Sequence, residues 1–254
     1  MRSLGGALGK GIRRGSGSVM ELMNLRLDRR WQYAAYLSLS LVALIFIVIL
    51  LPSSRAYFRR FFGNAHPVLV VIVASVLGAA ALDVLHARGG FEILKGQTTL
   101  RGIALSAGFA TLLAVAIVIA DFFLRYPKDT NVPVPQALLF YPAVGFVAEI
   151  VFHVLPLALL VLALSPLAKR FGTERIVWLG ILLVAVLEPT FQTLFEGKVF
   201  TWRAAYTWIH VFAIAFLQLY VFRRFDFVSM YSFRLIYYAY WHILWGVVRL
   251  KVLF

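Results

Sequence analysis

The sequence predicts an all-α, polytopic membrane helix bundle of about seven transmembrane helices. Composition is the first observation: 62% of the 254 residues are hydrophobic and 14% are charged, and the mean hydropathy is +0.86, well above the values of soluble domains. The apolar residues also occur in runs of roughly 20, the length that crosses a bilayer as a helix. The loops between these runs are short, so we expect one membrane domain and no separate soluble domain.

Seven apolar segments follow one another along the chain. The last of them is the weakest, because tyrosine, tryptophan and histidine make it amphipathic and Arg234 lies within it, so we expect it to be buried among its neighbours. Residues 1–30 are basic, rich in Gly and Ser, and lack the apolar core of a signal peptide. They predict a flexible cytoplasmic arm, followed by a membrane domain over 31–254 with a polar site within 138–250. The predicted spans are 31–52, 67–86, 102–123, 138–165, 176–195, 201–222 and 229–250.

The charge distribution predicts the orientation and the surroundings of the chain. Of the 25 Lys and Arg residues, 16 fall on the N-terminal side of the predicted spans and nine on the other side, which places the N-terminus in the cytoplasm and fits a multi-pass protein of a bacterial inner membrane. The net charge of +14 lies beside apolar runs, so it indicates anionic lipid headgroups as partners and not nucleic acid. The absence of cysteine excludes disulfides and thiolate chemistry.

Ionisable residues in the middle of the spans are the main functional clue. Glu149 and His153 lie in the fourth span, Glu188 in the fifth, His210 in the sixth and His242 in the seventh. A charge at the centre of a spanning helix costs about 2.5–3.5 kcal/mol on the insertion scale, so such residues face the bundle interior and mark functional sites. Because Glu149 and His153 are four residues apart, they share one helix face. We therefore expect the five side chains to meet in one polar cavity.

Neighbouring residues extend this pattern. Gln192 follows Glu188 by four residues, and Tyr206 precedes His210 by four. Pro156 and Pro189 are predicted to kink their helices, because proline removes a backbone hydrogen bond one turn upstream. The freed carbonyl groups could line a wet cavity.

Structural roles are the alternative for each of these residues, because membrane helices use Glu, Gln, Tyr and His as interhelical hydrogen-bonding groups. Asp83, His86 and Asp121 lie nearer the ends of their spans and are predicted to be solvated. Arg234 could pair with Asp226 or with a substrate. Extension of its side chain to the cytoplasmic headgroups is the preferred interpretation.

Two chemical routes are open to such a cavity. Glu149, His153, His210 and His242 could supply the ligands of a zinc ion that also binds water. Without a metal, Glu149 could take a proton from water while histidines stabilise the oxyanion formed on an amide carbonyl. Both routes lead to hydrolysis within the bilayer. The chain has neither a GxSxG turn nor a phosphate-binding GxxxxGK loop.

Two stretches carry a resemblance to a known family. The segment PAVGFVAEIVFHVLPLALL resembles the first motif, Glu-Glu-x-x-x-Arg, of the CPBP family of intramembrane proteases (CAAX-prenyl protease and bacteriocin-processing, also called abortive-infection proteins). In this motif Ala148, Glu149 and His153 take the three defined positions. The segment RLIYYAYWHILWG is similar to the last motif, His-x-x-x-Asn or Asp, with Tyr238 and His242 at its two positions.

The resemblance implies an intramembrane peptidase in which a glutamate activates water and His or Asn side chains polarise the carbonyl of a membrane protein or peptide. The middle motif, Phe-x-x-x-His, has no plain counterpart, and Glu188 occupies the corresponding helix. The alternative is a non-catalytic relative that binds a partner, peptide or lipid in the same pocket. Exchange of the motif residues for other ionisable ones favours the enzyme. A proton-coupled transporter is third, since no internal repeat is visible.

Overall fold

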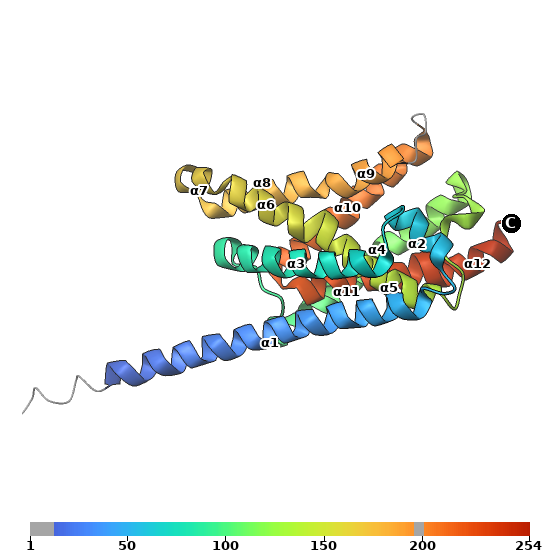
Figure 1. Cartoon of the computed structure of the whole chain (residues 1–254). Helices are drawn as coiled ribbons and strands as arrows, with labels where there is room; N and C mark the ends of the chain where they lie inside the picture. Colours follow the sequence, from blue (N-terminus) through green and yellow to red (C-terminus); the bar gives the residue numbers. More distant parts are fainter. Residues whose placement is uncertain (1–12, 196–200) are drawn as a thin grey trace, which may run out of the picture.

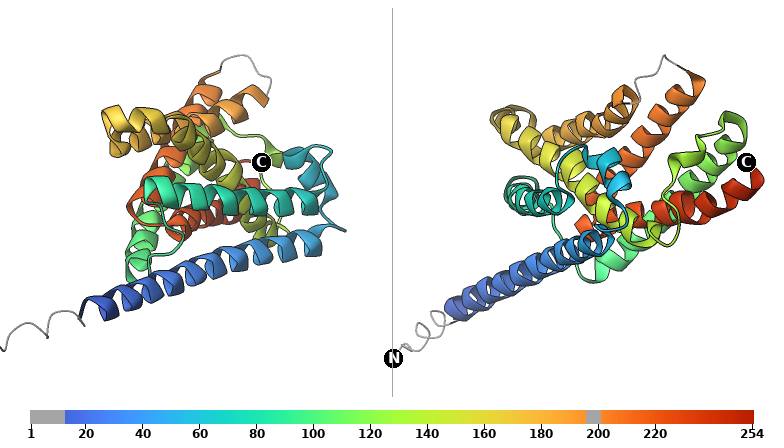
Figure 2. Two further views of the ribbon diagram at one scale, coloured as in Figure 1. Left: turned by 60° about the vertical axis from the view of Figure 1, so that its left-hand side comes forward. Right: turned by 45° about the vertical axis from the view of Figure 1, so that its right-hand side comes forward.

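The computed structural model describes residues 13–195 and 201–254, in which all regular structure is helical (Figure 1). The helices run back and forth along a common direction (Figures 1 and 2). Six helical segments are long and apolar enough to cross a membrane, which indicates an integral multi-pass membrane protein. These segments are Arg29–Leu50, Pro67–Gly89, Thr98–Leu124, Ala137–Ala163, Thr173–Leu194 and Trp202–Arg224.

The first helix is longer than the sequence predicted. Helix α1 (Arg13–Leu50) includes residues 13–30, which were expected to belong to a flexible arm, and it extends beyond the bundle (Figures 1 and 2). The run VMELMNLRL at 19–27 consists mostly of strong helix formers, and it continues the helix through the Gly and Ser positions. The predicted arm is therefore wrong for residues 13–30, and its residues 1–12 lie outside the described residues.

The second and third spans have clear end signals. Helix α3 (Pro67–Gly89) begins with proline in its first turn and ends at Gly90, whose left-handed backbone lets its N–H bond to the carbonyl of Leu85. Helix α4 (Gln97–Leu124) follows. Between α1 and α3 lies the short amphipathic helix α2 (Arg55–Phe62), which buries Phe58. A single 3₁₀ turn, η1 (Lys128–Thr130), follows α4.

The fourth and fifth spans are interrupted near their prolines, as predicted. The fourth consists of α5 (Ala137–Ala148), the π-helical segment η2 (Glu149–Val154) and α6 (Leu155–Ala163). Pro156 cannot donate a backbone hydrogen bond, which accounts for the wider turn just before it. The short helix α7 (Ser165–Phe171) leads to the fifth span, which breaks at Val186 into α8 (Thr173–Ala185) and α9 (Leu187–Phe195).

The last segment is helical but is not among the six apolar spans, so the predicted count of seven is corrected to about six. Helix α10 (Trp202–Arg224) is the sixth span. It leads to α11 (Phe227–Tyr238), the π-helical η3 (Ala239–Leu244) and α12 (Trp245–Val252). Helix α11 packs against α4, α5 and α10, which confirms that this amphipathic segment is buried among its neighbours. The chain ends at the opposite end of the bundle from the start of α1 (Figure 1).

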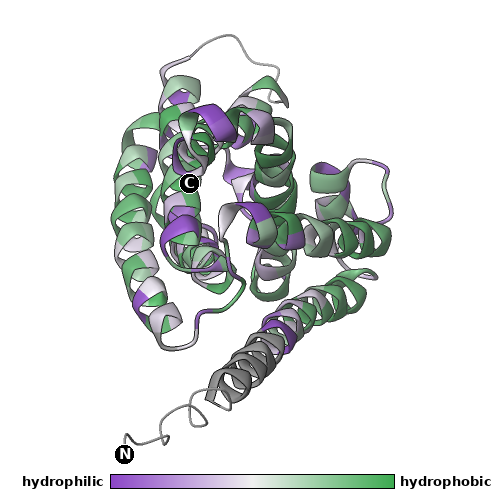
Figure 3. Ribbon diagram, turned by 90° about the vertical axis from the view of Figure 1, so that its left-hand side faces the viewer, coloured by the Kyte–Doolittle hydropathy of each residue, from purple (hydrophilic) through white to green (hydrophobic). Residues whose placement is uncertain are grey.

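The outside of the bundle is apolar. Large hydrophobic side chains such as Leu69, Leu112 and Ile119 are more than half exposed, and hydrophobic residues predominate along the long helices coloured in Figure 3. Exposed apolar surface on every side is stable in lipid and costly in water. Several polar and charged side chains are buried inside the bundle. A functional site is expected where these side chains contact one another.

Candidate functional site

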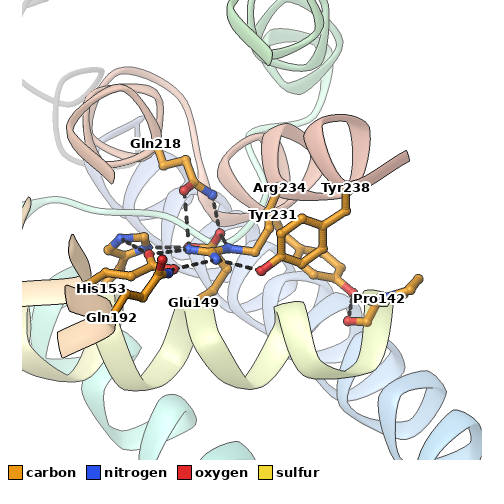
Figure 4. Close-up of polar contacts among 9 residues, drawn as sticks. Pro142, Glu149, His153, Gln192, Gln218, Tyr231, Arg234 and Tyr238 are labelled. Carbon is orange, nitrogen blue, oxygen red and sulfur yellow. Dashed lines mark hydrogen bonds and ion pairs between the residues drawn. The ribbon is translucent and has the colours of Figure 1, made fainter. Parts of the chain in front are cut away.

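Glu149 and His153 meet inside the bundle (Figure 4). Glu188 of α9 lies on the other side of the His153 ring. The Nδ1 atom of His153 lies 2.6 Å from Oε2 of Glu149, and its Nε2 atom lies 3.4 Å from Oε2 of Glu188. Glu149 and His153 have no exposed surface, and Glu188 is 4% exposed. The spacing of four residues thus places Glu149 and His153 in contact, as predicted. The imidazole lies between two carboxylates from different helices.

Arg234 is the cation of this cluster. From α11, its Nε donates to Oε1 of Glu149 at 2.5 Å, while its two terminal nitrogens donate to the two carboxylate oxygens of Glu188 at 2.9 and 2.8 Å. Paired donors in one plane match a carboxylate, and such forked bonds are among the strongest in proteins. Arg234 is only 2% exposed, so the prediction that it extends to the headgroups is wrong. Two buried carboxylates need a fixed cation nearby.

Three further polar side chains complete the cluster. Gln218 of α10 donates from Nε2 to Glu149 and accepts at 3.3 Å from Arg234. Gln192 donates to Glu188 at 3.3 Å. The hydroxyl oxygen of Tyr238 accepts from Arg234 at 3.0 Å. The cluster therefore joins four helical segments, namely η2, α9, α10 and α11.

One atom of the cluster lacks a hydrogen-bond partner. Among residues 13–195 and 201–254, no group forms a hydrogen bond with the buried Nε2 of His153. In the neutral form of the imidazole the proton lies on Nδ1, because Glu149 is an acceptor, and a lone pair on Nε2 then faces the carboxylate of Glu188. Two acceptors cannot bond to each other, which explains the 3.4 Å separation. Buried polar atoms without a partner are rare and often have a chemical role.

The local backbone contributes to this placement. Glu149 and His153 both lie in the π-helical segment η2, and such wider turns are frequent at functional sites. The π-helical segment η3 holds His242 in the same way. Each π-helical segment directly follows an α-helix. Each contains one histidine, His153 in η2 and His242 in η3.

His210 and His242 do not join the cluster, so the prediction of five residues in one cavity is wrong for these two. Nε2 of His210 bonds to the hydroxyl of Tyr237 at 3.0 Å. Nδ1 of His242 bonds to Oδ1 of Asn131 at 2.7 Å, and its ring stacks on Tyr141 with centroids 4.3 Å apart. Each ring has its own polar and aromatic partners, because neighbouring helices present them at closer range than the cluster does.

The zinc hypothesis required three of the side chains of Glu149, His153, His210 and His242 to surround one point. In the described part of the chain, no group of three or more His, Asp or Glu side chains is arranged to hold a metal ion. Within the central cluster the guanidinium of Arg234 occupies the position between the carboxylates. The zinc ligand set predicted from the sequence is therefore not assembled.

A second buried ion pair lies where the sequence predicted solvent. Asp121 and Arg249 are both fully buried, and Nε and one terminal nitrogen of Arg249 donate to the two oxygens of Asp121 at 2.7 and 3.0 Å. The indole of Trp245 and the backbone N–H of Tyr126 donate to the same carboxylate at 2.8 Å each. Asp121 is thus not a solvated helix end, because α12 covers it.

Asp83 and Asp226 differ in their exposure and in their hydrogen-bond partners. Asp83 is exposed and accepts from Tyr33 at 2.9 Å, as expected of a solvated helix end. Asp226 caps α11 by accepting from the backbone N–H of Ser229 at 2.8 Å. It also accepts from Thr99 and from the backbone of Lys95. Asp226 has these neutral donors and is not the partner of Arg234.

Sequence reasoning missed Gln218 and Asn131 and misplaced Arg234. The stripe of Arg234, Tyr238 and His242, at intervals of four residues, was visible and does face inward. Gln218 lies eight residues after His210 on the same face of α10, a signal that was available. Asn131 lies in a loop, and no helical periodicity pointed to it.

No family model, curated protein or solved structure matches this chain. The geometry of the central cluster therefore carries the functional argument by itself.

Proposed function

We propose that this chain is an intramembrane peptidase of the CPBP type in which His153 accepts the proton of the attacking water. The observation that carries this proposal is the state of the imidazole. Nδ1 is held by Glu149 at 2.6 Å, whereas Nε2 is buried without a hydrogen-bond partner. A carboxylate that orients one nitrogen and leaves the other free is the arrangement of a histidine general base.

Glu149 is less suited to be the base than the sequence suggested. Its carboxylate already accepts hydrogen bonds from Arg234, Gln218 and His153. These donors engage both of its oxygens, so its role in the proposed reaction is to orient the imidazole and to stabilise the imidazolium that forms.

Tyr238 supplies the second catalytic function. Its oxygen accepts from Arg234 at 3.0 Å, so its own O–H remains available as a donor. In the proposed reaction, His153 removes a proton from water while the water oxygen attacks the amide carbon. The Tyr238 hydroxyl donates to the oxyanion that forms. The C–N bond then breaks, and the proton on His153 passes to the leaving amine.

In this structure Glu188 blocks access to His153, so the proposed reaction requires a movement of Glu188. Glu188 lies 3.4 Å from Nε2 of His153 and covers it. Water and substrate reach the imidazole when Glu188 moves away together with α9. This movement is part of the proposed cycle, as in enzymes whose sites open for substrate.

A non-catalytic membrane protein that binds a peptide or lipid at this cluster is the second candidate. It is favoured by Ala148, which stands where the CPBP motif has its first glutamate. It is also favoured by the engagement of both carboxylates with Arg234.

Comparison of membrane proteomes separates the two candidates. Cells that express the wild type, His153→Gln or His210→Gln are compared for new termini in membrane proteins. The peptidase proposal expects the same cleavage products with the wild type and His210→Gln, and none with His153→Gln. His210 is a matched control because it is a buried histidine outside the cluster. Identical products from all three proteins would refute a role for His153.

We also propose that the chain lies in a bacterial inner membrane with a cytoplasmic N-terminus. The start of α1 and helix α7 lie at one end of the bundle (Figure 1). The segment from α11 to α12 is not one of the six apolar spans, but it runs through the bundle as a further crossing and brings the C-terminus to the other end (Figure 1). A reporter fused after Arg170 should therefore be cytoplasmic and one after Phe254 extracytoplasmic. Alkaline phosphatase and green fluorescent protein fusions measure this. A cytoplasmic signal from the fusion after Phe254 would contradict the topology.

A further inference from the structure

We propose that Arg234 forms a binding site for the carboxylate of a membrane-resident molecule, and that Glu188 occupies this site until the ligand displaces it. The proposal rests on the proposed function in one respect, since the same movement of Glu188 uncovers His153. The binding site itself is argued from the contacts of Arg234.

The existing contacts define the ligand chemistry. Both terminal nitrogens of Arg234 are directed at the two oxygens of one carboxylate, that of Glu188, at 2.9 and 2.8 Å. The hydroxyl of Tyr238 and the side chain of Gln218 adjoin the same guanidinium. A planar fork flanked by polar side chains is suited to a planar carboxylate from any source.

The positive charge of Arg234 stays paired with a carboxylate, that of Glu149, when Glu188 leaves. Its Nε remains bonded to Glu149 at 2.5 Å, and Glu149 is fully buried on another helix. The ligand enters as the neutral acid, and its proton passes to Glu188 as that side chain leaves, so the total charge of the ligand, Arg234 and the two glutamates does not change. Exchange of one carboxylate for another therefore avoids the large cost of a buried unpaired ion.

Glu188 lies on an element that is suited to moving. Helix α9 is separated from α8 by the break at Val186, with Pro189 in its first turn. It packs against α10 and α8, while Leu187 and Leu194 on its other side are 43% and 73% exposed. Leu187 and Leu194 are apolar and can stay in lipid when α9 shifts, and Glu188 moves with the helix in its neutral, protonated form.

A polar route leads from the surface of the bundle to the site. Gln192 is exposed and donates to Glu188 from one helical turn away. Glu188 in turn contacts Arg234 and His153. Gln192 lies near the end of the span Thr173–Leu194, where a polar headgroup at the membrane surface can reach it. The ligand is therefore an amphiphile with its carboxylate at the end that enters, such as a fatty acid or a hydrophobic peptide with a free C-terminus.

Equilibrium binding in lipid nanodiscs tests the site without any measurement of turnover. The probes are radiolabelled palmitate with palmitamide, and a hydrophobic peptide as free acid with the same peptide as C-terminal amide. The acid of either pair should bind at least about tenfold more tightly than its amide, which lacks the charge. Glu188→Gln should increase acid binding by about tenfold or more, because it removes the competing carboxylate. Arg234→Gln should abolish the preference for the acid.

A matched control and a folding control accompany these variants. Glu174→Gln changes a glutamate that also pairs with an arginine, Arg223, but at the end of α8 away from the cluster. It should leave binding unchanged. If Arg234→Gln does not fold, Arg234→Lys keeps the charge and loses the fork, and it should weaken acid binding.

Each outcome decides the proposal. A preference for palmitate identifies a fatty acid as the source of the carboxylate, and a preference for the peptide acid identifies a peptide terminus. Equal binding of acids and amides, or no gain in Glu188→Gln, overturns the site and makes the Arg234–Glu188 pair structural. Acid binding without cleavage of any membrane protein would leave the site standing and refute the peptidase. Cleavage of a membrane protein without a preference for acids over amides would support the peptidase and refute the carboxylate site.

Discussion

The buried clusters around Arg249 and Arg234 each pair an arginine with carboxylate groups. They differ in the ratio of carboxylates to arginine and in whether every polar atom has a hydrogen-bond partner. Around Arg249, one aspartate faces one arginine, and the remaining donors go to the backbone carbonyls of Tyr126 and Pro127 at 2.6 and 2.9 Å. Around Arg234, two glutamates share one arginine, and a histidine nitrogen between them has no hydrogen-bond partner. The first cluster has matched charges and closes the end of the bundle. The second has unused bonding capacity at its centre, which is where chemistry or binding is expected.

The helices that carry the two clusters support this distinction. Arg249 and Asp121 hold α12 to the end of α4 and to the loop that follows it. In the central cluster, Glu188 comes from the short helix α9, which is broken from its neighbour at Val186. A saturated pair fixes structure, whereas an ion pair that spans a helix break can open. The following predictions test that difference.

The largest expected effect is the loss of stability in Arg249→Met. It leaves Asp121 buried without its cation, which should reduce the free energy of unfolding by about 3–5 kcal/mol. Unfolding in mixed micelles with increasing SDS measures this. The exposed Arg224→Met serves as a control and should change stability by less than about 0.5 kcal/mol. The double variant Asp121→Leu/Arg249→Met should recover most of the loss, and wild-type stability of Arg249→Met alone would contradict a structural role.

Glu149→Gln should reduce the turnover of a cleaved membrane protein by about 10³-fold, because the amide no longer fixes the tautomer of His153 or stabilises its cation. Asp121→Asn makes the same chemical change in the other cluster. It should lower stability and leave turnover per folded molecule unchanged. Rates are measured on folded protein separated by size-exclusion chromatography. Equal loss of turnover in both variants would remove the functional distinction between the clusters.

Tyr238→Phe should reduce turnover by about 10²-fold, since one oxyanion donor contributes roughly that much. The ring and its packing against His242 remain, so the unfolding midpoint should stay near that of the wild type. Tyr237→Phe is the matched control, because the neighbouring hydroxyl bonds to His210 outside the cluster. Wild-type turnover in Tyr238→Phe would exclude the hydroxyl as the donor.

The smallest effect is expected for Asp226→Ala, which removes a buried acid that has no arginine partner. Loss of the cap on Ser229 should reduce stability by about 1 kcal/mol. The same measurement of SDS-induced unfolding applies. A loss as large as that of Arg249→Met would mean that neutral donors and an arginine stabilise a buried carboxylate equally, which would weaken the comparison.

The sequence by itself determined the membrane class, the helical fold and the places where the helices break. Apolar run length does not depend on tertiary contacts, so the six spans could be located to within a few residues. The pairing of Glu149 with His153 was equally predictable, because residues four apart meet on one helix. The same local rule identified Gln192 as the neighbour of Glu188.

The tertiary structure alone decided which buried groups meet across helices. Arg234 was assigned to the headgroups and Asp121 to solvent, because distance from a span end was the only available guide. The rotation of α11 and the cover provided by α12 place both inside. His210 and His242 bond to Tyr237 and to the loop residue Asn131 and not to the cluster. Depth follows from position along one helix, whereas contact depends on how several helices rotate and pack, and no single-helix pattern contains that information.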